Sequence, residues 1–178
     1  MVPAQTQFFN PLYILLLSPL FAWLWLRLGR SGREPSVTVK HALGLLLVGL
    51  GFVALVIGIR AAGSSDSVAL WWLALAYLLH TTGELCLSPP AYEAMTRLAP
   101  PKLSGVVMGL WFYSLAIGNY IAAQIAGYAV TADGSDRANS FGRFPEVFGQ
   151  VSIIAAIAGL AVLLLAPLMR KLTAGSGA

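Results

Sequence analysis

An acidic residue inside a long apolar run is the first candidate for chemistry. Glu84 lies in His80-Thr-Thr-Gly-Glu84-Leu-Cys-Leu-Ser88-Pro-Pro, within a helix that we expect to begin at Val68. Placing a carboxylate at membrane depth costs about 2.5 to 3.5 kcal/mol, so such acids usually face a cavity or a partner and serve ion or substrate pathways. The alternative is an acid near a helix end that is solvated or paired with Arg97.

His80 lies one helical turn before Glu84, on the same helix face. This spacing allows a hydrogen-bonded imidazole and carboxylate, which together would form a proton relay. The alternative is a polar residue that simply faces the bundle interior, because one histidine without a second ligand lacks metal-site spacing. Pro89 and Pro90 follow within two turns, and they indicate either a kink beside the acid or a simple bend or stop.

Other polar or amphipathic side chains in the apolar runs could line a pocket, among them Asn10 and Trp111. Tryptophan is also a common anchor at the membrane interface, so position alone leaves both interpretations open. The sequence has no nucleophile elbow, phosphate-binding loop, Cys/His metal cluster or paired catalytic carboxylates. We therefore expect neither an enzyme nor a metal site.

The elements that carry these residues are predicted to be transmembrane helices. Hydrophobic residues make up 58% of the chain and charged residues only 10%, whereas soluble domains carry about 25% charged residues. We expect an all-α, polytopic fold in which residues 1–178 form a single transmembrane domain. Its five spans are predicted at roughly 8–28, 42–59, 68–92, 103–128 and 146–168. Four glycines in the second span favour close helix approach: Gly44, Gly49, Gly51 and Gly58.

The basic residues predict the orientation of these spans in the membrane. The net charge is +4, but most basic residues flank the apolar runs instead of forming a stripe for nucleic acid. The connectors assigned to the cytoplasm hold Arg27, Arg30, Arg33, Lys40, Arg97, Lys102, Arg170 and Lys171, and those outside hold Arg60, Arg137 and Arg143. The positive-inside rule then places the N-terminus outside and the C-terminus in the cytoplasm. An odd number of spans suggests that further helices precede Met1.

Several segments resemble proton-dependent oligopeptide transporters. Those similar to the tenth and eleventh helices of that family are Gly83-Glu84-Leu-Cys-Leu-Ser88-Pro89, Leu98-Ala-Pro100, Met108-Gly-Leu-Trp111-Phe and Gly118-Asn119-Tyr. Those similar to its eighth and ninth helices are Asn10-Pro11-Leu-Tyr-Ile, Ser18-Pro19-Leu-Phe-Ala-Trp23 and Lys40-His-Ala-Leu-Gly44-Leu. The resemblance covers nearly the whole chain.

The resemblance implies part of the C-terminal half of a major facilitator superfamily fold, covering helices eight to twelve. It implies alternating access that moves di- and tripeptides inward across a bacterial inner membrane, with protons as the coupling ion and no other cofactor. By the same resemblance, Glu84 pairs with the peptide's amino terminus, and Asn10, Ser88 and Trp111 line the pocket.

The sequence departs from the family in length and at one motif. The amino-terminal half is absent, and Pro90-Ala-Tyr92-Glu93 stands where the family usually has a Gly-Leu type sequence. Because alternating access needs two halves around one site, we expect no transport by this chain alone. We expect it to require membrane lipid and either the missing half or a partner chain. The alternative is a non-transporting membrane fragment or accessory interaction subunit.

Overall fold

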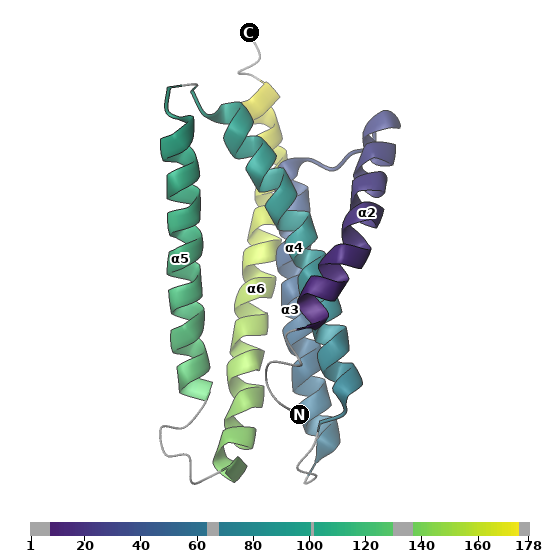
Figure 1. The fold of residues 1–178 in the computed structure, drawn as a ribbon, viewed down its shortest axis with the longest axis vertical. Coiled ribbons are helices and arrows are strands. Elements are labelled where there is room, and N and C mark those ends of the chain that lie inside the picture. The colour runs from purple at the N-terminus through teal and green to yellow at the C-terminus, as the bar shows by residue number, and fades with distance from the viewer. Residues whose placement is uncertain (1–7, 64–67, 101, 130–136, 175–178) are drawn as a thin grey trace.

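The part of the chain that the structure describes folds into five helices. The computed structural model describes residues 8–63, 68–100, 102–129 and 137–174. The helices are α2 (Phe9–Arg30), α3 (Val37–Ala62), α4 (Leu70–Leu98), α5 (Ser104–Ala129) and α6 (Arg137–Ala174). They run alternately up and down along the long axis of the molecule (Figure 1). The described residues contain no strand, so the prediction of an all-α fold is confirmed.

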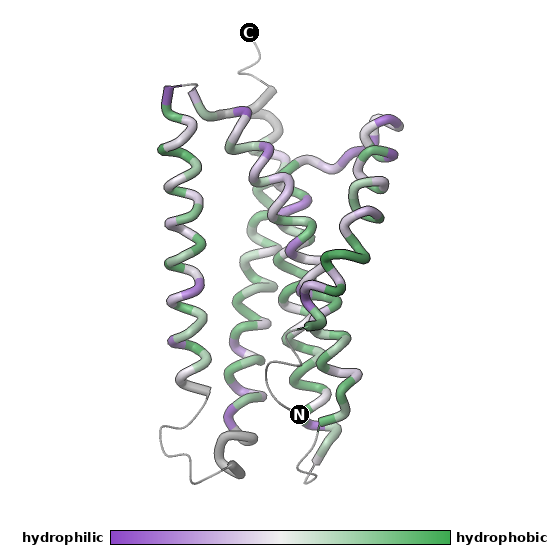
Figure 2. Tube along the Cα trace, viewed as in Figure 1, coloured by the Kyte–Doolittle hydropathy of each residue, from purple (hydrophilic) through white to green (hydrophobic). Residues whose placement is uncertain are grey.

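Four of these helices are long and apolar enough to cross a membrane. They are Phe9–Arg30, Val37–Ala62, Ser104–Gly127 and Arg143–Met169. Helix α4 has 29 residues, enough to span, but His80 and Glu84 dilute its apolar content. Hydrophobic residues predominate along most of the helices (Figure 2). These features define a multi-pass membrane protein.

The helix bounds differ from the predicted spans where local capping or tertiary packing decides them. Helix α3 begins at Val37, five residues before the predicted span, because Ser36 caps it: its hydroxyl accepts a hydrogen bond from the Val39 amide at 3.4 Å. Helix α6 begins at Arg137 instead of residue 146 and contains Pro145. The connector between the predicted spans 103–128 and 146–168 is therefore partly helical, and residues 130–136 lie outside the described part of the chain.

Helix α4 also continues through the tandem proline. Pro89 and Pro90 lie inside it, and the helix ends only at Leu98. Prolines are tolerated in membrane helices when neighbouring groups satisfy the freed backbone carbonyls. The interpretation of this pair as a helix stop is therefore wrong.

A row of glycines joins α3 to α4. Gly44, Gly51 and Gly58 recur every seven residues, so they lie along one face of α3. A Cβ added at Gly44 would lie 2.8 Å from the Gly83 carbonyl oxygen, and one at Gly58 would lie 2.6 Å from the Trp72 ring. At Gly51 it would collide with the His80 ring. Each glycine thus makes room for α4, which confirms the expected close approach.

Helix α3 is the centre of the bundle. Its other side packs on α6, where a Cβ at Gly49 would lie 3.2 Å from the Ser152 carbonyl oxygen. Contacts of α3 with α4 and α6 far exceed those of any other helix pair. Helix α2 packs mainly on α4, and α5 touches α4 and α6 only slightly, standing apart from the block in Figure 1.

Candidate functional site

The face of α4 turned away from the glycine row carries a line of polar and aromatic side chains. Tyr77, Thr81, Glu84, Ser88 and Tyr92 follow one another at three- and four-residue steps. These steps place all five side chains along one face of the helix. We refer to these five residues as the α4 stripe.

The first turn of α2 contacts one end of the α4 stripe. The Phe9 and Tyr77 rings lie 6.1 Å apart. The Asn10 side-chain amide donates a long hydrogen bond of 3.5 Å to the Thr81 hydroxyl. Thr81 is 0% exposed, and a buried hydroxyl needs a partner. Thr81 is not among the predicted site residues, although its position three residues before Glu84 places it on the same helix face.

Glu84 lies one turn further along the α4 stripe. Its side chain is exposed, and no hydrogen bond or ion pair reaches its carboxylate from the residues that the structure describes. Arg97 does not pair with it, because the Arg97 guanidinium contacts the Glu93 carboxylate at 3.4 Å instead. A carboxylate at this depth without a protein partner is suited to binding a cationic group.

His80 points into the glycine row. Its ring packs against Phe52 of α3 with the centroids 4.7 Å apart, and it lies in the space left by Gly51. Its Nε2 atom is buried and has no hydrogen-bond partner in the described part of the chain. No hydrogen bond joins His80 to Glu84 within those same residues. The proton relay of His80 with Glu84 stays a prediction.

Ser88 and Trp111 lie at the other end of the α4 stripe. Ser88 is half-buried one turn after Glu84, and Trp111 of α5 is also half-buried. The Trp111 ring meets Tyr92 edge-on with the centroids 5.7 Å apart. Asn10, Glu84, Ser88 and Trp111 therefore lie on or against one face of α4.

The side chains on this face have the chemistry to bind a polar, partly cationic molecule. Glu84 offers a negative charge, while Asn10 and Ser88 offer hydrogen-bond donors and acceptors beside it. Among the described residues, no group of three or more His, Cys, Asp or Glu side chains could hold a metal ion. The arrangement thus favours recognition of a ligand by charge and hydrogen bonds.

A multi-pass helical membrane protein is the class that the fold defines. The model of the POT family matches residues 1–147, so the chain belongs to the POT family. This finding confirms the resemblance described above and the assignment to part of a major facilitator superfamily fold. The relatives are transporters, which confirms the prediction that the chain is not an enzyme.

The similar proteins are much longer than this chain. It is 37% identical over 171 residues to the uncharacterized transporter YclF of Bacillus subtilis, covering 95% of the chain and 32% of YclF. It is 36% identical over 174 residues to the peptide transporter YePEPT of Yersinia enterocolitica, covering 96% of the chain and 33% of YePEPT. A crystal structure of the peptide transporter POT in complex with sulfate superposes with a TM-score of 0.78 at 37% identity, covering 92% of the chain and 31% of that protein. The chain spans about a third of the length of these relatives.

Proposed function

We propose that this chain is the C-terminal part of a proton-coupled di- and tripeptide transporter that works by alternating access. The observation that carries the proposal is the exposed Glu84 carboxylate, which has no partner among the described residues and lies between hydrogen-bonding side chains. The similarity to YePEPT, named a peptide transporter, supports a peptide substrate. So does a 27% identical POT family transporter, solved with a thioalcohol-conjugated peptide, which superposes with a TM-score of 0.75.

Glu84 binds the ammonium group at the amino terminus of the peptide in this proposal. The attraction between the two charges is stronger in a cavity of low dielectric constant than in water. Asn10 and Ser88 donate and accept hydrogen bonds with the peptide's polar groups, and Trp111 packs against its side chain. Protonation of Glu84 removes the negative charge, so proton occupancy and peptide release are linked.

The site needs a second wall. Alternating access encloses one site between two halves of a transporter, so we propose that the missing half or a partner chain supplies the other wall. The excess of basic residues in the connectors 27–41 and 97–102 supports an N-terminus outside and a C-terminus in the cytoplasm of a bacterial inner membrane. No observation favours the alternative of an accessory, non-transporting subunit.

The test uses a complete transporter that contains this chain. Residues 1–178 replace the corresponding segment of YePEPT, and uptake of a labelled dipeptide is measured in proteoliposomes with and without an inward proton gradient. We expect gradient-dependent uptake that Glu84→Gln lowers by about tenfold or more, because a charge-assisted hydrogen bond is lost. Glu146→Gln, which replaces an exposed acid of α6, is the matched control and leaves uptake unchanged.

Two results would overturn the proposal. If Glu84→Gln transports the dipeptide as fast as the unchanged chimera, the carboxylate does not bind the substrate. If the purified 178-residue chain alone takes up dipeptide, the requirement for a second half is wrong.

A further inference from the structure

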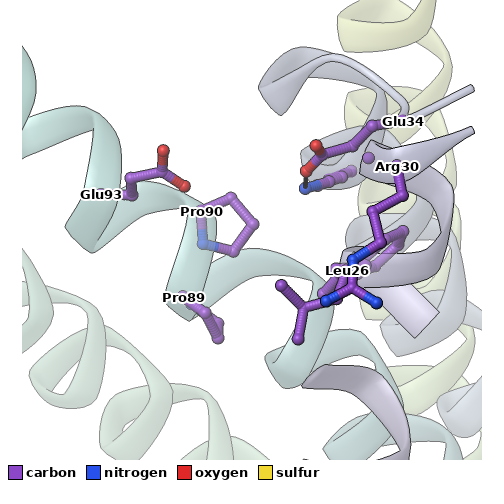
Figure 3. A pocket seen from close by; sticks show the side chains of 9 residues that line it. Leu26, Arg30, Glu34, Pro89, Pro90 and Glu93 are labelled. Carbon is purple, nitrogen blue, oxygen red and sulfur yellow. Dashed lines mark hydrogen bonds and ion pairs between the residues drawn. The ribbon is translucent and has the colours of Figure 1, made fainter. Parts of the chain in front are cut away.

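A hollow lies at the C-terminal end of α2, away from the Asn10 contact. It has a volume of about 480 Å³ and is bounded by the last turns of α2, the connector to α3, the start of α3, and α4 at and beyond its prolines. Figure 3 shows Glu93 and Pro90 of α4 on one side of this space and Leu26, Arg30 and Glu34 on the other. Pockets of this size commonly bind small molecules.

The walls of this hollow are part apolar and part charged. Trp25 and Leu26 of α2 and the two prolines of α4 supply apolar lining, while Arg30 and Glu93 supply charged groups. A hollow lined partly by apolar and partly by charged side chains fits an amphipathic ligand better than a fully water-soluble one.

One charged pair in the hollow is already neutralised. The Lys40 side chain is only 6% exposed, and its ammonium contacts the Glu34 carboxylate at 2.5 Å. The same ammonium lies 4.5 Å from the centre of the Trp25 ring, which adds a cation–π interaction. Lys40 and Glu34 therefore neutralise one another and leave no net charge for a ligand.

The two remaining charges stand on opposite walls. Arg30 has no ion pair among the described residues. Glu93 contacts Arg97 at 3.4 Å, but the side chains are 62% and 78% exposed, and an exposed pair of this kind contributes little. A ligand that bridges the hollow would therefore offer an anionic group to Arg30 and a cationic group to Glu93.

The place of the hollow in the membrane points to a lipid. Arg27 and Arg30 end the apolar run of α2, and such basic residues mark the boundary with the headgroup region. A phosphate joined to a primary ammonium by a two-carbon linker has the two charges that the opposite walls require.

We infer that this hollow binds the headgroup of phosphatidylethanolamine, with the phosphate on Arg30, the ammonium on Glu93 and an acyl chain along Leu26. The inference does not depend on the proposed peptide transport. Phosphatidylcholine has no N–H to donate to Glu93, and phosphatidylglycerol has no cation. The site therefore distinguishes among these three lipids.

The test measures lipid retention by the purified 178-residue chain with native mass spectrometry. Phosphatidylethanolamine, phosphatidylcholine and phosphatidylglycerol with identical acyl chains are added in equal amounts. We expect phosphatidylethanolamine to be retained about tenfold more than the other two, the ratio that one charge-assisted hydrogen bond gives. Equal retention of all three lipids would overturn the inference.

Substitutions of Arg30 and Glu93, one on each wall of the hollow, test whether the lipid binds there. Arg30→Gln and Glu93→Gln each lower phosphatidylethanolamine retention to the level of phosphatidylcholine, and both replace exposed side chains, so the fold is preserved. The matched controls Arg33→Gln and Glu146→Gln leave retention unchanged. Full retention by both wall variants would place the lipid elsewhere and refute the assignment.

Soluble phosphoethanolamine separates a membrane lipid from a free phosphate ester. Because the apolar wall contributes to binding, we expect millimolar phosphoethanolamine not to displace the lipid. Displacement at concentrations comparable to those of the lipid would show that the hollow takes a soluble compound and would overturn the lipid assignment.

Discussion

The two sides of α4 differ in what they contact. The side that carries Trp72, His80 and Leu87 fills the spaces left by the α3 glycines, and backbone atoms of the two helices come close there. Among the described residues, the side that carries Glu84 and Ser88 contacts the start of α2 and, through Tyr92, the Trp111 and Phe112 rings of α5. One helix thus provides both a face packed on α3 and a more accessible face, which is the proposed binding face. A residue's role therefore depends on which side of α4 it lies on.

The same contrast separates the helices around α4. Helix α3 contains seven buried residues, whereas α2 contains none. On α5, large apolar side chains such as Leu110, Phe112 and Ile121 are more than half exposed. Within a membrane such side chains face lipid or other helices without the cost that water would impose. The block of α3, α4 and α6 therefore holds its shape by its own packing, while α2 and α5 are weakly attached.

The largest effect on stability is expected from placing a large side chain in the contact between the α3 glycines and α4, which we call the seam. Gly44→Leu would bring a side chain against the Gly83 carbonyl oxygen, which lies 2.8 Å from an added Cβ and belongs to the backbone. We expect the free energy of unfolding in detergent to fall by about 3 kcal/mol or more, because α3 and α4 must separate. Gly118→Leu, at a position with nothing within 4 Å, is the control and should not lower it. Equal stability of the two variants would show that the seam is not tightly packed.

A smaller effect is expected from the buried hydroxyl on the binding face. Thr81→Val removes the acceptor for the Asn10 amide while keeping the size of the side chain. We expect the KM of the chimeric transporter for dipeptide to rise about fivefold, the equivalent of one hydrogen bond, with kcat little changed. Thr81→Ser should keep the original KM.

A double-mutant cycle shows whether Thr81 acts through Asn10. In an Asn10→Ala background, Thr81→Val should raise the KM no further, because the two residues form one unit. Additive effects of the two substitutions would mean that Thr81 only packs the helix and does not position Asn10.

We expect Lys40→Met to lower the free energy of unfolding by about 1 kcal/mol. The substitution removes the contact with Glu34 and the cation–π interaction with Trp25, but Glu34 is 44% exposed in its side chain and regains water. Thermal unfolding in detergent at low and high salt measures the change. A loss as large as that of Gly44→Leu would contradict the view that the end of α2 is weakly attached.

The smallest effect is expected at the surface. Arg97→Ala removes only the exposed pair with Glu93, so the free energy of unfolding should change by less than about 0.5 kcal/mol. The same unfolding experiment checks this value. A larger loss would indicate that the C-terminal end of α4 depends on this pair.

The sequence predicted the features that depend on composition and local spacing. The five apolar runs became five helices, and the predicted site residues Asn10, Glu84, Ser88 and Trp111 lie on or against one face of α4. The four-residue spacing of His80 and Glu84 allows a proton relay, which stays a prediction, but it does not indicate that the His80 ring lies in the space left by Gly51 of α3. That space depends on which helix packs beside α4, so helical spacing alone did not predict it.

The sequence also did not predict contacts between residues that lie far apart along the chain. The partner of Thr81 lies 71 positions earlier in the chain. Lys40 was assigned to an exposed basic connector, yet it is 5% exposed because Glu34 and the Trp25 ring surround its ammonium. In both cases the tertiary arrangement of α2 against its neighbours decides the environment of the side chain.

The most direct test of the account measures two properties of Glu84→Gln in the same chimeric transporter. Dipeptide uptake and the thermal unfolding midpoint are compared with those of the unchanged chimera. The account predicts that uptake falls by about tenfold or more while the midpoint is unchanged, because Glu84 belongs to the binding face and contributes nothing to the seam. Normal uptake with a lowered midpoint would contradict it and make Glu84 a packing residue.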